Sequence, residues 1–577
     1  MSTRFFYEGT GFLKNIELIT ITSIEQLNQF RDDWSFILEE NENTNPFIEF
    51  DWIYAWWKHL GNNKNVEIIA VLNNGEIIAF FPFLYENKGW LYKYNFIGFG
   101  YANYMDFISY KHSLEYVIAL VLDFIIVERK SVVFYLHGLL ESGFSIRRLE
   151  GYIRNREMTY STHRVITPFI DLEKISKEEY LKKRKKLHRV DKNEKRMRES
   201  GVVEVLPTGP EHMETIFNLH HKRWKKKRDT SGFTNKKERK FYQSLAQLQE
   251  GPLTTEIDGL FMDGKMIAFK YGYKCRGRYV GYVISFEDDF KVFSPGRILE
   301  KDKILQCSKR GINIVDFSIG YEPYKFEWNT DIDYTRKIIF SSKSLTAQLL
   351  RLYLSLKELF ISRIKLNRRL VLFKRNKIGK FLYVIKNILS KTEKAGVREE
   401  IAAFIHPKLN KLFEWKRYTI YEIASKNVPE DLEKDKYVEL TIREAINNYD
   451  SVKEHMRDIC TKIYGGYKGY YLPGHLSFEN VFWTNEKVIR IDNIGYLRVF
   501  KKSSVHIENW RTENLAEICS YVKKISKANK IFISVKANLN KEISELEKIG
   551  FTIHQQIFKR TILGFSKAIF TNEKNSA

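Results

Sequence analysis

Residues 288–328 contain the side chains best suited to group-transfer chemistry. Gly296 and Arg297 lie at the start of a predicted helix, where backbone N–H groups and a guanidinium can bind an anion such as a phosphate. Asp316 follows at the end of a predicted strand, and Tyr324 and Lys325 lie in the loop after it. A lysine in such a loop can stabilise the oxyanion that develops when a carbonyl is attacked. The spacing therefore predicts an anion-handling active site.

Each of these residues also has a structural interpretation. Gly296 and Arg297 fit an ordinary helix start behind Pro295. Asp316 fits a carboxylate paired with a lysine or arginine, and Lys325 fits a surface lysine. The sequence leaves both interpretations open.

A second group of candidates lies on a predicted helix within LHHKRWKKKRD (residues 219–229). His221 is a candidate base for the proton of an acceptor amine, and Arg223 and Trp224 are candidate substrate-binding residues. The alternative for the histidine is packing or helix capping. Asp106, within YANYMDF, is expected to face the same cleft.

Motifs for other chemistries are absent from the sequence: there is no GxSxG, HExxH, Walker loop or GxGxxG after a strand. The four cysteines are widely spaced and contain no CxxC pair, so neither a metal site nor a disulfide framework is expected. Direct attack by an acceptor amine or hydroxyl on a bound acyl donor needs only positioning, deprotonation and oxyanion stabilisation.

The elements that position these residues are repeated along the chain. GEIIAF (75–80) follows Asn74, and GKMIAF (264–269) follows Asp263, so each predicts a hairpin with a two-residue turn. Residues 481–499 are a weaker third copy. Strand and helix patterns follow each copy, which predicts repeated α/β lobes. Between the first two lobes, residues 178–201 predict a charged helix, either solvated or presenting a basic face to an acidic group.

Charge is concentrated in one segment. The chain has 577 residues and a net charge of +24, and Lys343 to Lys394 contribute 14 Lys or Arg against two Glu. Residues 346–389 are also amphipathic, so they predict helices that pack on the preceding lobe or bind an anionic membrane surface or nucleic acid. The N-terminus has no signal-peptide core, and the longest apolar run is too short to span a bilayer. We therefore expect a cytoplasmic protein, with peripheral attachment at the inner face of the membrane as an option.

Several segments together resemble the GNAT-like acyltransferases of the CelD/BcsL type, distant relatives of the FemAB aminoacyl transferases. The resembling segments occur in order over roughly residues 20–345: NPFIEFDWIYAWW (45–57), FFPFL (80–84), GFGYANYMDF (98–107), LHHKRWKKKRD, GKMIAF, FSPGRILEKDKI (293–304) and DFSIGYEPYKFEW (316–328). The resemblance implies an α/β (α+β) fold of tandem GNAT-like lobes, with mixed central sheets flanked by helices. It also implies Lys325 near the reacting carbonyl and acyl-CoA phosphates at Gly296 and Arg297, although standard GNAT loops carry two glycines where this chain has one.

The resulting division is a first lobe (1–172), a central acetyltransferase lobe (173–345), a basic helical linker (346–399) and a C-terminal GNAT-like domain (400–577). The last domain has Leu546 where GNAT enzymes often carry a tyrosine, and it lacks a phosphate loop, so it is expected to be non-catalytic.

The resemblance implies an N-acetyltransferase that uses acetyl-CoA or another acyl-CoA, without a metal, and acts on a small-molecule amine or a glycan acceptor in cell-envelope or polysaccharide biosynthesis. Aminoacyl transfer from tRNA is one alternative. A non-catalytic scaffold that binds an anionic membrane through residues 346–394, or nucleic acid, is the other.

Overall fold

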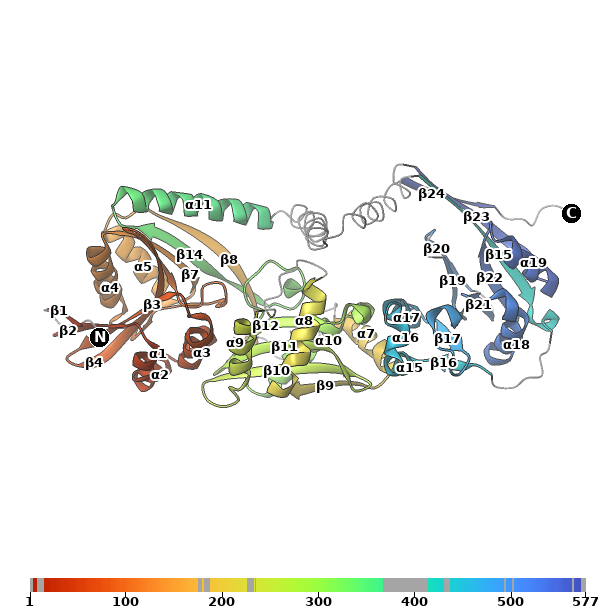
Figure 1. Cartoon of the computed structure of the whole chain (residues 1–577), viewed down its shortest axis with the longest axis horizontal. Coiled ribbons are helices and arrows are strands. Elements are labelled where there is room, and N and C mark those ends of the chain that lie inside the picture. The colour runs from red at the N-terminus through yellow and green to blue at the C-terminus, as the bar shows by residue number, and fades with distance from the viewer. Residues whose placement is uncertain are drawn as a thin grey trace, which may run out of the picture.

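The computed structural model describes residues 4–7, 15–174, 179–180, 187–225, 233, 235–366, 413–429, 436–491, 494–500, 503–562 and 565–571. In these residues a 14-stranded sheet, an 8-stranded sheet and a two-stranded sheet are flanked by helices (Figure 1). The predicted α/β fold class with mixed sheets is confirmed. No helix within these ranges is long and apolar enough to cross a membrane.

The first lobe surrounds a core rich in aromatic side chains. Its α3 helix (FDWIYAWWKHL) buries Trp52 and Trp56 completely, because tryptophans four residues apart lie on one helix face. The elements of this lobe are β1 (Arg4–Tyr7), β2 (Ile16–Ile21), α1 (Ile24–Asn28), α2 (Arg31–Glu40), η1 (Pro46–Ile48), α3 (Phe50–Leu60), β3 (Asn65–Asn73), β4 (Glu76–Lys88), β5 (Leu91–Phe96), β6 (Ile108–Ser109), α4 (Leu114–Arg129), β7 (Ser131–Leu140), α5 (Phe144–Asn155) and β8 (Tyr160–Asp171).

The central lobe repeats the same succession of a hairpin, a third strand, a helix and a parallel strand. Its elements are α7 (Leu187–Glu199), β9 (Val203–Thr208), η2 (Pro210–His212), α8 (Met213–Lys225), α9 (Lys236–Ala246), β10 (Leu253–Met262), β11 (Lys265–Cys275), β12 (Arg278–Phe286), η3 (Asp288–Phe293), α10 (Pro295–Lys309), β13 (Ile314–Asp316), η4 (Lys325–Glu327) and β14 (Asp331–Ser341). The strand β13 is short and ends at Asp316. The reason is that Ser318 takes a left-handed φ of 64° while its N–H donates to the Asp316 carboxylate, 2.6 Å away.

The two predicted hairpins agree in detail. Asn74 and Gly75 have φ values of 52° and 87°, and Asp263 and Gly264 have 47° and 83°, so both turns need residues that tolerate positive φ. In the first hairpin the register shifts after Val71 pairs with Ala79, and in the second it shifts after Leu260 pairs with Ala268. The bulge therefore falls at the same place in GEIIAF and GKMIAF, which supports a true internal repeat.

The last strand of each lobe pairs within the other lobe. β7 pairs in parallel with β5 and antiparallel with β14, while β13 lies between β12 and β8. β8 and β14 also pair with each other. The sheet order is β1-β2-β3-β4-β5-β7-β14-β8-β13-β12-β11-β10-β9, with β6 beside β4. The two lobes thus share one continuous sheet.

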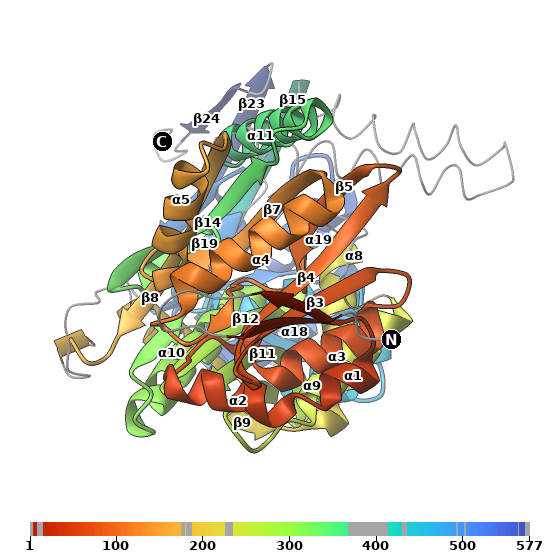
Figure 2. The same ribbon diagram turned by 90° about the vertical axis from the view of Figure 1, so that its left-hand side faces the viewer.

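One further helix, α11 (Leu345–Leu366), covers the face of this sheet opposite α4 and α5 (Figure 2). Alternate residues of β7 divide between the two faces: Val132, Phe134 and Leu136 join the main core, whereas Val133 and Tyr135 face α11. The rest of the predicted basic linker, beyond residue 366, lies outside the described residues.

The C-terminal domain has its own 8-stranded sheet, with strand order β16-β17-β18-β21-β22-β15-β23-β24. Its elements are β15 (Phe413–Ala424), β16 (Val438–Leu440), α15 (Ile442–Asn447), α16 (Tyr449–Val452), α17 (Met456–Tyr464), β17 (Lys468–Tyr471), η7 (Phe478–Asn480), β18 (Phe482–Asn485), β19 (Val488–Ile491), β20 (Tyr496–Val499), β21 (Ser504–Glu508), α18 (Leu515–Ser526), β22 (Lys530–Lys536), α19 (Asn540–Ile549), β23 (Thr552–Ile562) and β24 (Phe565–Thr571). The third hairpin copy predicted at 481–499 is wrong, because β18 pairs with β17 and β21 while β19 pairs with β20.

Candidate active site

The candidate site lies where β12 and β13 separate. These parallel strands pair only from Arg278 to Val280 on β12, and β12 then continues to Phe286, hydrogen-bonded to β11 alone. Gly281, Tyr282, Val283 and Ile284 are half-buried, although β12 is a central strand of the sheet. The backbone edge of β12 after Val280 is therefore not paired with β13 and lies close to the N-terminus of α10. An amide-bearing ligand could pair with such an edge.

Predicted residues from two segments, α8 and α10, lie against the ring of Phe286 at the end of β12. The Arg223 guanidinium of α8 lies 3.7 Å from the centre of that ring. A Cβ added to Gly296 of α10 would lie 3.4 Å from the ring, an ordinary van der Waals contact, so α10 begins directly beside Phe286. Tyr324, in the loop after β13, lies within electrostatic range of Arg223 and of Glu300. The structure thus brings Arg223 and Gly296 to the same ring, and Tyr324 interacts electrostatically with Arg223.

Arg223 and Tyr324 differ from surface residues in their electrostatics. Burial lowers the pKa of Arg223, opposed by Asp288, whose carboxylate is 4.0 Å away. Burial also raises the pKa of Tyr324, and the nearby carboxylates of Glu300 and Glu322 raise it further. The Tyr324 phenol therefore keeps its proton near neutrality and is available as a hydrogen-bond donor.

Lys325 and Arg297 hold the loop that carries Tyr324. The Lys325 ammonium is buried and donates to the carbonyl of Ile319 at 2.6 Å, with Glu322 at 3.2 Å. Arg297 donates to Glu327 at 2.7 Å. The surface-lysine interpretation of Lys325 is therefore wrong. In this structure both cations fix the loop.

Asp316 is enclosed by partners. It is 1% exposed, and it accepts hydrogen bonds from the Tyr104 hydroxyl at 2.8 Å and from two nitrogens of Arg278. The Ser318 N–H is a further donor. The alternative interpretation of a paired carboxylate describes this geometry. Since Tyr104 belongs to the first lobe, Asp316 also joins the two lobes.

No contact joins His221 or Asp106 to this cluster among the described residues. His221 precedes Arg223 by two residues on α8, so the two side chains lie on different faces of the helix; its buried Nδ1 has no hydrogen-bond partner among the described residues. The side chain of Trp224 lies outside the described part of the structure. Asp106 accepts from the N–H of Phe107 at 2.8 Å and interacts with Ser145 of the first lobe, and its burial raises its pKa to about 6.

Sequence reasoning missed the groups by which the first lobe reaches the site. The Tyr282 hydroxyl, on β12, donates to the carbonyl of Tyr101 at 2.8 Å, and Asn103 bonds to Ser318. The segment GFGYANYMDF contains these partners, and its aromatic and amide residues were the available signal. A buried ion pair between Lys270 of β11 and Glu300 of α10 was also missed. Its signal was a charged residue directly after the apolar Leu299 in the predicted helix.

The N-terminus of α10 fits a diphosphate poorly. Three consecutive acids, Glu287, Asp288 and Asp289, precede it. Ser294, before the first turn, accepts a hydrogen bond from Asn193 of α7 at 3.1 Å, and Asn193 accepts one from Tyr464 of the C-terminal domain at 2.8 Å. α7 and α17 therefore cover the position where Gly296 and Arg297 were expected to bind phosphates.

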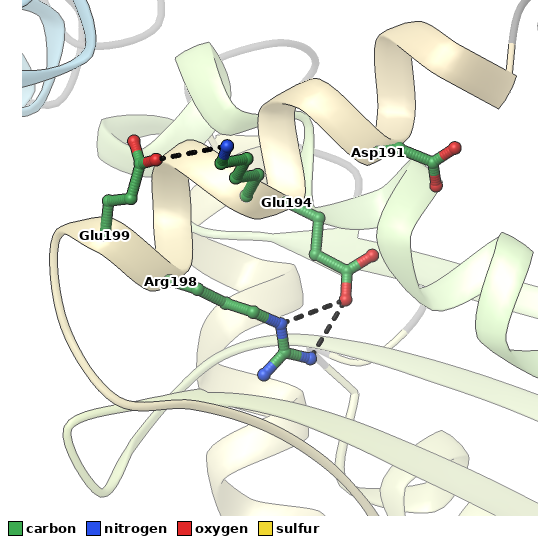
Figure 3. Close-up of a pocket in the computed structure, with 5 residues that line it drawn as sticks. Asp191, Glu194, Arg198 and Glu199 are labelled. Carbon is green, nitrogen blue, oxygen red and sulfur yellow. Dashed lines mark hydrogen bonds and ion pairs between the residues drawn. The ribbon is translucent and has the colours of Figure 1, made fainter.

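A surface hollow of about 410 Å³ lies along α7 and is lined by Asp191, Glu194, Lys195, Arg198 and Glu199 (Figure 3). Its charges are mutually paired: Arg198 bonds to Glu194 at 2.9 Å and Lys195 lies 4.0 Å from Glu199. Opposite charges of the same helix neutralise each other, so the hollow is a poor anion site. The other side of α7 buries Val190 and Met197, so the helix is amphipathic and not solvated all round.

Comparison with known proteins gives a match in the central lobe. Residues 182–326 match the family described as "Acetyltransferase (GNAT) domain". This range contains α8, β12, α10, β13 and Tyr324. No curated protein matches the chain by sequence.

Solved structures resemble a little more than half of the chain. FemX has a TM-score of 0.42 and 11% identity, covering 56% of this chain and 98% of its own. L-PGS from Bacillus licheniformis has a TM-score of 0.36 and 13% identity, covering 56% and 95%. A tandem GNAT protein from the clavulanic acid biosynthesis pathway has a TM-score of 0.32 and 8% identity, covering 56% and 98%.

Proposed function

We propose that the chain is an acyltransferase of the GNAT type that transfers an acyl group from a thioester, such as acetyl-CoA, to an amine or an amino sugar. The observation that carries the proposal is the separation of β12 from β13 inside the matched GNAT domain. This separation leaves a strand edge that the amide-bearing arm of acyl-CoA can pair with. The end of that edge reaches Arg223 and Tyr324.

The proposed step is direct transfer. The acceptor nitrogen attacks the thioester carbon, the N–C bond forms and the C–S bond breaks. Tyr324 donates its proton to the leaving thiolate. Arg223 stabilises the negative charge that develops on the carbonyl oxygen. The amine proton passes to solvent, because His221 lies on a different face of α8 from Arg223.

Lys325, Arg297 and Asp316 act as positioning residues in this proposal. Lys325 and Arg297 hold both ends of the loop that carries Tyr324. Asp316 fixes the start of the same loop against Arg278 and the first lobe.

Aminoacyl transfer from tRNA is a second candidate. The acids before α10 and the cover provided by α7 and α17 disfavour a diphosphate at that position. A donor whose anionic part binds elsewhere on a chain of net charge +24 would avoid this conflict. From the resemblance alone, we also propose that the acceptor belongs to cell-envelope or polysaccharide biosynthesis.

The test is release of free thiol when the purified full-length chain is incubated with acetyl-CoA and a panel of amines and amino sugars. The four cysteines are buried, so the thiol assay has a low protein background. Acceptor-dependent thiol release supports the proposal. No release and no binding at millimolar acetyl-CoA, with transfer from an aminoacyl-tRNA instead, supports the second candidate.

Tyr324→Phe tests the proposed acid. We expect kcat to fall by about 10²–10⁴-fold, the usual contribution of general acid catalysis. Tyr321→Phe is the matched control, because Tyr321 lies in the same loop and is exposed. Equal activity of the two variants would contradict the role of Tyr324.

A further inference from the structure

The outer face of α11 exposes an apolar stripe. Its members follow helical spacing and are between 41% and 73% exposed: Leu345, Leu349, Leu352, Tyr353, Leu356, Leu359 and Phe360. Monomeric soluble proteins seldom expose apolar side chains in one continuous row of this length, and such a row commonly marks an interaction surface. At 1.5 Å per residue, the helix is roughly 33 Å long.

The opposite face fixes α11 to the sheet. Ala347 and Leu354 pack on Val133 and Ile339. Glu358 accepts a hydrogen bond from the Tyr135 hydroxyl at 2.6 Å and pairs with Lys337 at 2.9 Å. These contacts hold the helix in one rotation about its axis, so the apolar stripe faces away from the sheet.

The charges around the stripe are of one sign. Lys343, Lys357 and Arg363 are exposed beside it. Between residues 343 and 364 the single acid is Glu358, which faces the sheet. A rigid apolar row flanked by cations complements a surface that is apolar inside and anionic outside.

We propose that the outer face of α11 binds the surface of an anionic lipid bilayer, with the helix axis parallel to the membrane. The apolar row would enter the headgroup boundary, and the three cations would contact anionic headgroups. Nucleic acid would use the cations but would leave seven apolar side chains in water. The lipid surface uses both features.

Trp90 extends the surface beyond the helix. It is 73% exposed in the turn between β4 and β5, and its neighbour Leu91 packs into the cluster beneath α11. Tryptophan is enriched at the membrane–water interface. Quenching of Trp90 fluorescence by lipid probes, measured as the difference from a Trp90→Phe variant, gives a second readout.

The experiment is flotation of the full-length chain with vesicles of phosphatidylcholine alone or with phosphatidylglycerol added. We expect binding to the anionic vesicles that weakens with salt. Leu349→Ser, Leu352→Ser, Leu356→Ser and Phe360→Ser together should abolish it. Replacing Lys343, Lys357 and Arg363 by Gln should weaken it about a hundredfold, at roughly fivefold per cation.

The matched control replaces exposed apolar residues elsewhere, Phe36→Ser, Val127→Ser and Leu497→Ser; it should bind as the unmodified chain does. Thermal unfolding checks that each variant is folded. The proposal is overturned if the unmodified chain ignores anionic vesicles, or if the α11 variant still binds them. It is also overturned if the α11 substitutions instead convert a dimer to a monomer, or if the chain binds tRNA through the three cations and not vesicles.

Discussion

Asp316→Asn replaces a buried carboxylate by a neutral amide of nearly the same shape. The variant leaves the Arg278 guanidinium, whose side chain is 11% exposed, without its counter-charge. Removing one member of a buried ion pair costs about 3–5 kcal/mol of the free energy of unfolding. In a domain of this size about 1 kcal/mol shifts Tm by roughly 2 °C, so Tm of the lobes that share the sheet should fall by about 6–10 °C. Differential scanning calorimetry of the full-length chain measures this.

The control is the double variant Arg278→Met and Asp316→Leu, which removes both charges. Replacing a buried pair by apolar residues is often neutral, so most of the lost Tm should return. Tyr104→Phe removes one hydrogen bond to a charged group and should cost about 1.5–3 kcal/mol. If Asp316→Asn left Tm unchanged and abolished acyl transfer, Asp316 would take part in the chemistry and the positioning role would be refuted.

Three further predictions concern other positions. Gly138→Ala should lower the free energy of unfolding by about 2–4 kcal/mol, because Gly138 has a φ of +82° and a Cβ would lie 2.7 Å from the Met105 nitrogen. Gly151→Ala is the control: no atom lies within 4 Å and the residue lies inside α5, so alanine should raise the free energy of unfolding by about 0.5–1 kcal/mol. Equal losses of Tm in the two variants would contradict this. Burial raises the pKa of Asp106 from 3.8 to about 6, so the folded state binds the carboxyl proton more tightly than the unfolded state. The stability that this proton contributes is present below pH 3.8 and is lost as the pH rises through 6. Asp106→Asn should therefore raise Tm at pH 7.5 and lose that advantage near pH 4, and the opposite trend would refute the raised pKa. Lys270→Met should destabilise the central lobe by about 3–5 kcal/mol by leaving Glu300 buried and unpaired, and adding Glu300→Leu should restore most of the Tm; no recovery in the double variant would argue for a role of these residues beyond their pairing.

Local features of the fold could be predicted from the sequence. Asn74-Gly75 and Asp263-Gly264 specify their turns through positive φ, and no distant contact is needed to select them. The helix after Pro295 could likewise be predicted locally, because its apolar residues follow helical spacing and a proline is favoured in the first turn of a helix.

The sequence could not predict which strands pair, which helices cover the site, or which side chains bind Asp316 and Lys325. Nothing near residue 331 indicates that β14 pairs with β7, because any strand with an apolar pattern could fill that place. The covering of the α10 N-terminus by α7 and α17 depends on a domain more than a hundred residues away. The partners of Asp316 and Lys325 depend in the same way on Tyr104, Arg278 and the course of the loop, so residue type alone could not separate pairing from catalysis.

The last strand of each lobe pairs with a strand of the other lobe, β8 with β13 and β14 with β7, and this affects the order of folding during synthesis. The strands of the first lobe end at residue 171, but β7 has no antiparallel partner until β14, which ends at residue 341, has left the ribosome. At about 5–20 residues per second, translation of the intervening stretch takes roughly 10–30 s. During that time the edge of β7 is open to pairing with another chain. We therefore expect nascent chains that stop between the two lobes to depend on chaperones, whereas release of the completed β14 ends that dependence.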